Sequence, residues 1–321
     1  MTDEFEKQWG QSLLSVIETV DNQMCVVNDG RVVCCVGLIA TFYFLDGDRP
    51  EVRERVVRAY ETYQKAIGDK LIWGADPKTH RPKKLAGTQI ANVRSWVSRI
   101  APGDDLEFVY HGGKDKNDAN AYMTKALVQV ETEGELSYFT FGVPLAWLVP
   151  HSLQGFVKLV LEVSEILRPE HGYAGFGIID HVASSSNSDM AVVTGFAKRF
   201  SGLEIDDPGS HSIYLSNTPA IKGVNWLTVL GQSWLDKLGG ETAVIAELGE
   251  GPTLHPFDGG AIVQAGPRPL LGDRNQNEPM VAYRQVAKAL KPIRSNYISS
   301  IASAYGFNKE QTTQWLQRFD D

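Results

Sequence analysis

The chain has 321 residues, of which 43% are hydrophobic and 22% charged, a balance typical of globular proteins that excludes collagen-like, low-complexity and wholly disordered classes. The net charge is −8, and residues 1–150 and 151–321 each contribute −4, with 17 and 14 Lys and Arg against 21 and 18 Asp and Glu. Neither half is basic, which argues against nucleic acid or an anionic membrane as the main partner. An acidic surface suits a basic protein partner, although charge that serves only solubility explains the balance equally well.

We expect a soluble, cytoplasmic protein. Residues 1–7 are acidic and no apolar signal segment follows them, and the longest apolar run, residues 32–45, is too short to span a bilayer. The cysteines Cys25, Cys34 and Cys35 are too few and too close together for a disulfide framework, and they lack the spacing of a zinc site.

The hydrophobic pattern predicts a first strand over residues 32–45 and then a helix that begins at Pro50 and ends at Gly68. Further helices are expected to begin at Pro292 and after Asn308, which has Gln311 in the capping-box position. The order predicts an α+β fold with mixed, largely antiparallel sheets and packed helices. The elements expected between these ends are a helix over 88–100, strands over 106–110, 121–131 and 135–143, a helix over 153–167, a strand over 173–180, helices over 186–200 and 224–238, strands over 242–248, 252–256 and 261–265, and a helix over 279–290.

Matching elements in the two parts of the chain begin at a constant offset of 136 residues, from 50 to 186, from 88 to 224 and from 106 to 242. This regularity favours two related α+β halves, residues 1–168 and residues 169–321, the second of which carries the terminal helices. One compact domain is the alternative organisation.

The search for catalytic motifs is negative. No phosphate-binding GxxxxGKS or GxxxxGKT loop, GxSxG nucleophile elbow or HExxH metal helix is present. The Gly-Phe-Gly segment at 175–177 resembles the start of a dinucleotide fingerprint, but Asp180 replaces the third glycine and the segment lies in a predicted strand. We therefore expect no catalytic residue, no cofactor and no metal. The alternative is a metal-dependent nuclease or hydrolase that uses the D-x-K pair Asp76 and Lys78.

A distinctive segment, NTPAIKGVNWLT at residues 217–228, is followed by a glycine- and tryptophan-containing stretch at 230–240. Together these segments resemble a family of type VI secretion immunity proteins that was once catalogued as a domain of unknown function. The similarity covers most of the chain and is closest to the immunity partners of TseT-type nuclease effectors. Further segments that fit the family are 37–39, 173–177, 264–269, 271–273, Tyr283 and 290–294.

The resemblance implies a protein that binds a cognate secreted effector toxin, a nuclease, and neutralises it by occlusion in the cell that produces it. It implies no catalytic residues and no direct contact with nucleic acid or membrane, and it leaves the oligomeric state open. The alternative without catalysis is a structural subunit of the secretion machinery.

The partner-binding surface is expected in acidic loops near the ends of strands and helices, where charges stay solvated at little cost. A nuclease has a positive substrate groove, and carboxylates can imitate the phosphates that it binds. The predicted partner-binding residues are Asp104, Asp105, Glu107, Glu131, Glu133, Glu135, Glu204, Asp206 and Asp207.

Overall fold

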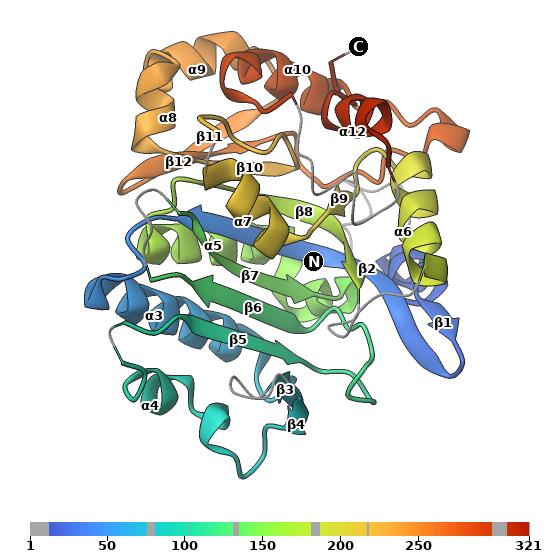
Figure 1. Cartoon of the computed structure of the whole chain (residues 1–321). Coiled ribbons are helices and arrows are strands. Elements are labelled where there is room, and N and C mark those ends of the chain that lie inside the picture. Colours follow the sequence, from blue (N-terminus) through green and yellow to red (C-terminus); the bar gives the residue numbers. More distant parts are fainter. Residues whose placement is uncertain are drawn as a thin grey trace.

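A computed structural model describes residues 13–75, 81–101, 103–130, 135–180, 187–216, 218–296 and 307–320. The strands are β1 (Val26–Asn28), β2 (Arg31–Phe44), β3 (Trp73–Ala75), β4 (Pro82–Lys84), β5 (Leu106–His111), β6 (Met123–Val128), β7 (Ser137–Val143), β8 (His171–Asp180), β9 (Glu204–Ile205), β10 (Leu227–Gly231), β11 (Thr253–Phe257) and β12 (Gly260–Gln264). They form one twelve-stranded sheet in the order β11-β12-β10-β8-β2-β7-β6-β5-β3-β4, with β1 paired to β2 and β9 paired to β8 (Figure 1). Only β8 and β9 pair in parallel among these strands, so the expected α+β fold with largely antiparallel pairing is confirmed.

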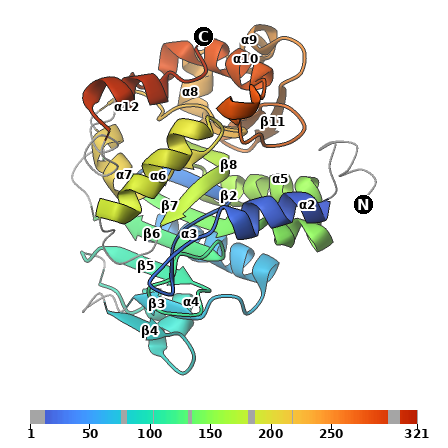
Figure 2. The same ribbon diagram turned by 90° about the vertical axis from the view of Figure 1, so that its right-hand side faces the viewer.

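Helices cover both faces of the sheet. Figure 2 shows α3 and α5 on one side of it and α6 and α7 on the other, while α8, α9, α10 and α12 gather around the end of the sheet formed by β10, β11 and β12. The helical segments are α2 (Leu13–Ile17), η1 (Glu18–Gln23), α3 (Pro50–Ile67), η2 (Gln89–Ala91), α4 (Val93–Val97), η3 (Leu145–Trp147), α5 (Leu148–Leu167), α6 (Asn187–Arg199), α7 (Pro208–Ser216), α8 (Gln232–Lys237), α9 (Glu241–Leu248), η4 (Arg274–Gln276), α10 (Val281–Ala289), η5 (Lys291–Ile293) and α12 (Lys309–Leu316).

The centre of the sheet is the pair β2 and β8. They run antiparallel over ten residue pairs, and β2 is buried from Val33 to its end because helices lie on both of its faces. Glycine permits the close contact between the two strands, since a Cβ on Gly177 would lie 2.2 Å from Cδ1 of Ile39. The glycine-containing segment at 175–177 therefore serves strand packing within β8.

Aromatic side chains fill the layer between the sheet and the helices α3 and α5. The ring of Tyr63 on α3 stacks on Phe141 of β7 at 5.0 Å, and Phe156 on α5 stacks on Trp226 at 6.1 Å. Trp226 is fully buried and donates its indole N–H to the carbonyl of Gly266 at 3.0 Å. This layer fixes α3 and α5 on one face and leaves the opposite face to α6, α7 and the polar groups described below.

Several segments differ from the sequence prediction. The helix expected to begin at Pro292 is wrong, because the chain forms only the short 3₁₀ turn η5 there and residues 294–296 are not helical. The helix expected over 224–238 is wrong at its start, where the chain forms β10 and only then α8. Because β10 is buried between β8 and β12, it lacks the alternating pattern that distinguishes a strand. The strand expected over 242–248 is wrong as well, since the segment forms α9, whose first turn carries Glu241. The helix expected over 88–100 shortens to α4, because the Asn92 side chain accepts the N–H of Ser95 at 2.8 Å and begins the helix there.

The hypothesis of two related halves rested on three pairs of matching elements. Two of these pairs used the helix expected from 224 and the strand expected from 242, which the structure shows to be a strand and a helix, so they no longer support it. The division after residue 168 stays a prediction, and the pairing of β2 with β8 carries one sheet across that boundary.

Candidate functional site

The first predicted acidic cluster lies where β5 begins. Asp104 and Asp105 are exposed, and Glu107 is half-buried on β5. The Asp105 Oδ1 atom accepts the backbone N–H of Val130 at 2.7 Å, which holds this loop against the end of β6. Val130, at the start of the loop between β6 and β7, therefore lies beside the start of β5.

The second predicted cluster belongs to that neighbouring loop. Glu131 and Glu133 lie outside the described residues, and Glu135 is half-buried just before β7. Leu136, which follows Glu135, donates its backbone N–H to Ser216 Oγ at the end of α7, at a distance of 2.7 Å. The antiparallel pairing of β5, β6 and β7 thus brings Glu135 to the same edge of the sheet as the first cluster, and Leu136 ties this end of β7 to α7.

The third cluster departs from expectation. Asp207 is half-buried and accepts the N–H of Ser210 at 3.3 Å in the first turn of α7. Glu204 and Asp206, expected in an exposed loop, are only 3% and 5% exposed. The expected exposure is wrong for these two residues because β9 is drawn into the sheet beside β8 and its carboxylates face an internal network of charges.

Glu204 is held by two cations. Its Oε1 atom lies 2.8 Å from Lys222 Nζ, and its Oε2 atom lies 3.4 Å from Arg318 Nη2 and accepts the amide N–H of Asn225 at 3.2 Å. The Lys222 side chain is 2% exposed and also donates to Tyr173 Oη at 3.2 Å. Burial lowers the pKa of Lys222, whereas Glu204 and Asp206 act in the opposite direction.

Asp206 is held by hydroxyl groups on the sheet. Its Oδ1 atom accepts hydrogen bonds from Thr41 Oγ1 at 2.8 Å and from Tyr173 Oη at 2.7 Å. Burial raises the pKa of the Asp206 carboxyl, and the charge of Lys222 opposes this. Two buried carboxylates and two buried cations balance, so the network is neutral as a whole and binds β8, β9, Lys222 and the C-terminal segment together.

Carboxylates from the first and third clusters approach one phenol. Burial raises the pKa of Tyr138 on β7, and the negative charges of Glu107, Asp206 and Asp207 raise it further. The Tyr138 Oη atom lies against α7, where a Cβ on Gly209 would be 3.7 Å away. Glu107 and Asp207, which are 100 residues apart in the sequence, are therefore both near enough to Tyr138 to raise its pKa.

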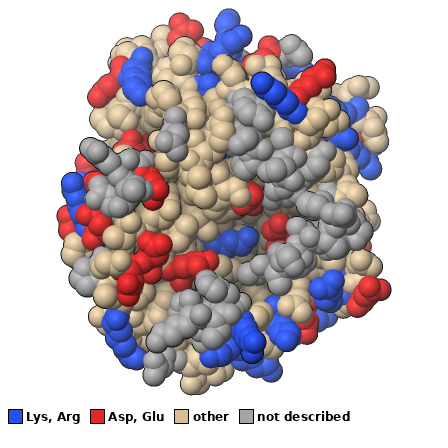
Figure 3. Space-filling view, in the orientation of Figure 1, with Lys and Arg blue, Asp and Glu red and all other residues tan. Residues whose placement is uncertain are grey.

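This face of the molecule is hollowed near its centre. In the orientation of Figure 1, a basic side chain lies in the hollow with acidic side chains around it (Figure 3). On the same side of the sheet, Lys125 of β6 forms an ion pair with Asp180 at the end of β8 at 3.9 Å, and both side chains are less than one-third exposed.

Two histidines are buried close to this network. Burial, together with the charge of Lys222, lowers the pKa of His171 to about 3 and places that of His211 well below its usual value. The ring of His171 packs on Tyr43 at 4.8 Å. Both imidazoles are therefore neutral in the folded protein at neutral pH.

Sequence reasoning missed the cations of the network, Lys222 and Arg318. The one local signal was a lysine between the apolar residues Ile221 and Val224, within the segment that carries the family resemblance. Both cations pair with Glu204, from which Lys222 is 18 positions away in the sequence and Arg318 is 114 positions away. Such pairings depend on tertiary structure.

The alternative catalytic pair, Asp76 and Lys78, lies outside the described residues. The part of the chain that the structure describes contains no group of three or more His, Cys, Asp or Glu side chains that could hold a metal ion. Within the same part, no helix has the length and apolar character needed to cross a membrane.

Comparison with known proteins identifies a family and a similar solved structure. A family model described as TsiV, type VI immunity for VRR-NUC, matches residues 55–319. The solved structure of the Pseudomonas aeruginosa T6SS protein PA0821 is similar to this chain, with a TM-score of 0.82 and 25% sequence identity over 96% of this chain and 91% of that chain. Among curated proteins the sequence has no match. The expected type VI immunity family is thereby confirmed, and a closer relation to the TseT type stays a prediction.

Proposed function

Because the chain belongs to the TsiV family of type VI immunity proteins, we propose that it binds a cognate VRR-NUC effector, a nuclease, and neutralises it in the producing cell. The observation that carries the proposal is the family match over residues 55–319. The similarity of the whole fold to a T6SS protein supports it. We place this function in the cytoplasm and assign it to binding, without a reaction catalysed by the chain.

The acidic edge is the surface that we propose for the effector. We define it as Asp104, Asp105, Glu107, Glu135 and Asp207. The partner-binding role of Glu131 and Glu133, which lie outside the described residues, stays a prediction from the sequence. A nuclease must carry positive charge where it binds phosphates, so an acidic surface accelerates the encounter and can occupy that groove. Glu204 and Asp206 do not belong to the contact surface, because the network buries their carboxylates. Their role is to fix β9, and with it the start of α7.

An apolar anchor is available on the same side. Ile213 of α7 is 65% exposed, and its helix begins directly after Asp207. Interfaces of high affinity combine a charged rim with a few buried apolar or aromatic contacts. We therefore assign steering of the encounter to the acidic edge and part of the affinity to Ile213.

The function is tested by co-expressing the chain with its proposed VRR-NUC effector. A stable complex and loss of nuclease activity in the presence of excess immunity protein are expected. An effector that stays fully active, or that forms no complex, contradicts the proposed function.

The surface is tested by the double charge reversal D104K/E135K, measured for effector affinity at low and high salt. We expect affinity to fall about tenfold or more at low salt and the salt dependence to weaken, as for charges that steer association. The matched control is E162K/E165K, which reverses two exposed charges on α5, on the opposite face of the sheet. If D104K/E135K behaves like this control while Ile213→Ala weakens binding, the contact is apolar and the acidic edge is not its site.

A further inference from the structure

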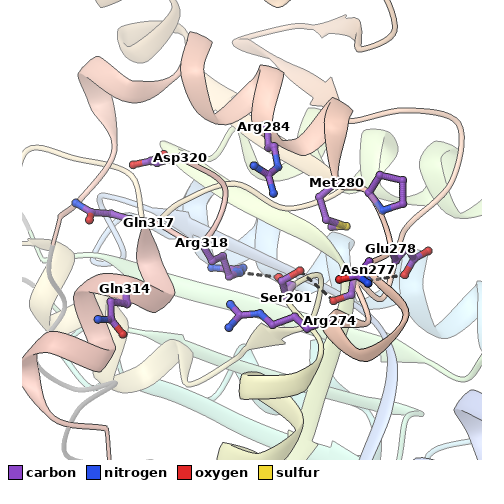
Figure 4. A pocket seen from close by; sticks show the side chains of 12 residues that line it. Ser201, Arg274, Asn277, Glu278, Met280, Arg284, Gln314, Gln317, Arg318 and Asp320 are labelled. Carbon is purple, nitrogen blue, oxygen red and sulfur yellow. Dashed lines mark hydrogen bonds between the residues drawn. The ribbon is translucent and has the colours of Figure 1, made fainter.

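A second polar site lies at the C-terminal end of the fold, between η4, α10 and the end of α12. It is a pocket of about 630 Å³. Three arginines line it: Arg274 of η4, Arg284 of α10 and Arg318, which follows α12. Their guanidinium groups point toward the same part of the pocket (Figure 4). The acidic edge does not contribute to this lining.

Arg318 is fixed in place by the protein. Its side chain is 2% exposed. Nε donates to the carbonyl of Ser201 at 2.7 Å, Nη1 donates to the carbonyl of Trp315 at 2.9 Å, and Nη2 lies 3.4 Å from Glu204 Oε2. The guanidinium plane is therefore held before any ligand arrives, which reduces the entropy lost on binding.

The other two arginines are not neutralised. Arg274 and Arg284 are exposed, and neither guanidinium has an ion pair or hydrogen bond with the described residues. The carboxylates of the pocket are already engaged. Glu278 Oε2 accepts the backbone N–H groups of Gly272 at 2.7 Å and Asp273 at 3.2 Å, and Asp320 forms an ion pair with Arg294. Glu278 keeps its negative charge in these hydrogen bonds, so the lining carries three arginines against two carboxylates, Glu278 and Asp320, and retains a small excess of positive charge.

We propose that this pocket binds a small molecule that carries phosphoryl groups. Planar guanidinium forks match phosphate oxygens with two hydrogen bonds each. Arg274 and Arg284 offer two forks that the described residues leave unengaged, and Arg318, whose nitrogens already contact the protein, adds a fixed positive charge beside them. The side chains of Gln314 and Gln317 add amide donors at the rim. The pocket volume lies within the range of small-ligand sites. Its described lining offers no aromatic ring for a base to stack on, so the recognised part is the phosphoryl end of the ligand.

Binding there connects α10 to α12. An anion shared by Arg284 on α10 and Arg318 beyond α12 would hold the C-terminal segment against the body of the fold. A ligand that binds only the folded state raises the unfolding temperature as its concentration increases. The proposal is independent of the effector interaction, so either one can fail alone.

The experiment measures binding of pyrophosphate and inorganic phosphate to the full chain, by calorimetry and by thermal unfolding at constant ionic strength. Saturable binding and a rising unfolding temperature are expected, with sulfate and a dicarboxylate such as succinate at least tenfold weaker. Equal binding of sulfate, tighter binding of succinate, or no saturable phosphate binding at millimolar concentration overturns the proposal.

The variant R274A/R284A locates the site. Both side chains are exposed and unpaired within the described structure, so the variant should unfold at the wild-type temperature without ligand and bind pyrophosphate at least tenfold more weakly. The control R58A/R81A removes the same charge from exposed arginines on α3 and just before β4, and it should bind like the wild type. In R274K/R284K, which keeps the charge and loses the forks, affinity should fall several-fold. Unchanged pyrophosphate binding by R274A/R284A places the anion elsewhere and overturns the assignment.

Discussion

Replacing Lys222 with methionine isolates the charge that the buried network needs. Methionine is a flexible, unbranched apolar side chain that can occupy the space of the lysine stem, so Lys222→Met removes the ammonium while keeping most of the packing. The ammonium lies 2.8 Å from Glu204 Oε1 and donates to Tyr173 Oη at 3.2 Å. Without it, the buried carboxylates of Glu204 and Asp206 face a single buried cation, Arg318.

Breaking a buried ion pair by removing one partner costs about 3–5 kcal/mol, because the remaining charge stays desolvated. We expect the lower end, about 3 kcal/mol, because Glu204 keeps Arg318 at 3.4 Å and Asp206 keeps two hydroxyl donors. The cost should shrink as the pH falls. Lys222 now holds down the pKa of Asp206, so in the variant this pKa rises further above its unfolded value. A carboxyl group whose pKa is raised by folding stabilises the folded state when it is protonated at low pH. This contribution is lost as the pH rises through the pKa of the folded protein.

Urea unfolding at several pH values, followed by two spectroscopic probes, measures the free energy of unfolding. The control is K158M, on the exposed surface of α5, which should change this free energy by no more than about 0.5 kcal/mol. The double variant K222M/E204Q should recover part of the loss, since it removes the uncompensated charge. A loss below about 1 kcal/mol in K222M, with no recovery in the double variant, would refute the reasoning.

Three further predictions follow from the same structure. The pKa of the buried His171 is about 3 in the folded protein and 6.5 in the unfolded chain, so on lowering the pH from neutral to about 5 only the unfolded chain binds this proton. The free energy of unfolding should therefore fall by about 2 kcal/mol over this interval, and His171→Gln should reduce this pH dependence in urea titrations. Asn308→Ala removes the capping box of α12, in which the side chain accepts the N–H of Gln311 at 2.8 Å, and should cost about 1 kcal/mol in thermal unfolding. Glu204→Gln should lower stability yet leave effector affinity unchanged in the folded protein, because the side chain is buried; calorimetric titration with the effector tests this, and a large affinity loss would place Glu204 in the contact.

Local signals were sufficient for several elements. Pro50 and Gly68 fixed both ends of α3, since proline suits the first turn of a helix and Gly68 takes a positive φ of 63° after its last turn. The capping box at Asn308 was readable because both of its hydrogen bonds join residues three positions apart. The long apolar run became β2, the central strand of the sheet.

The candidate site was only partly readable from the sequence. Runs of acidic residues pointed to Asp104, Asp105 and Asp207, which lie at or near the surface, but the same signal selected Glu204 and Asp206, which are buried. A carboxylate's exposure depends on whether distant cations reach it, and the spacing of acidic residues carries no information on that.

What the sequence determined by itself is therefore the set of features formed within a few residues, namely the helix ends, the apolar central strand, the α+β class and the family segment at residues 217–240. Tertiary structure decided the rest. It made residues 227–231 a strand, because β8 and β12 lie on either side of them. It gathered Arg274, Arg284 and Arg318 around one pocket and buried Glu204 with Lys222. The physical reason is that a hydrogen bond or ion pair between distant segments depends on how the whole chain packs, and local periodicity does not encode that packing.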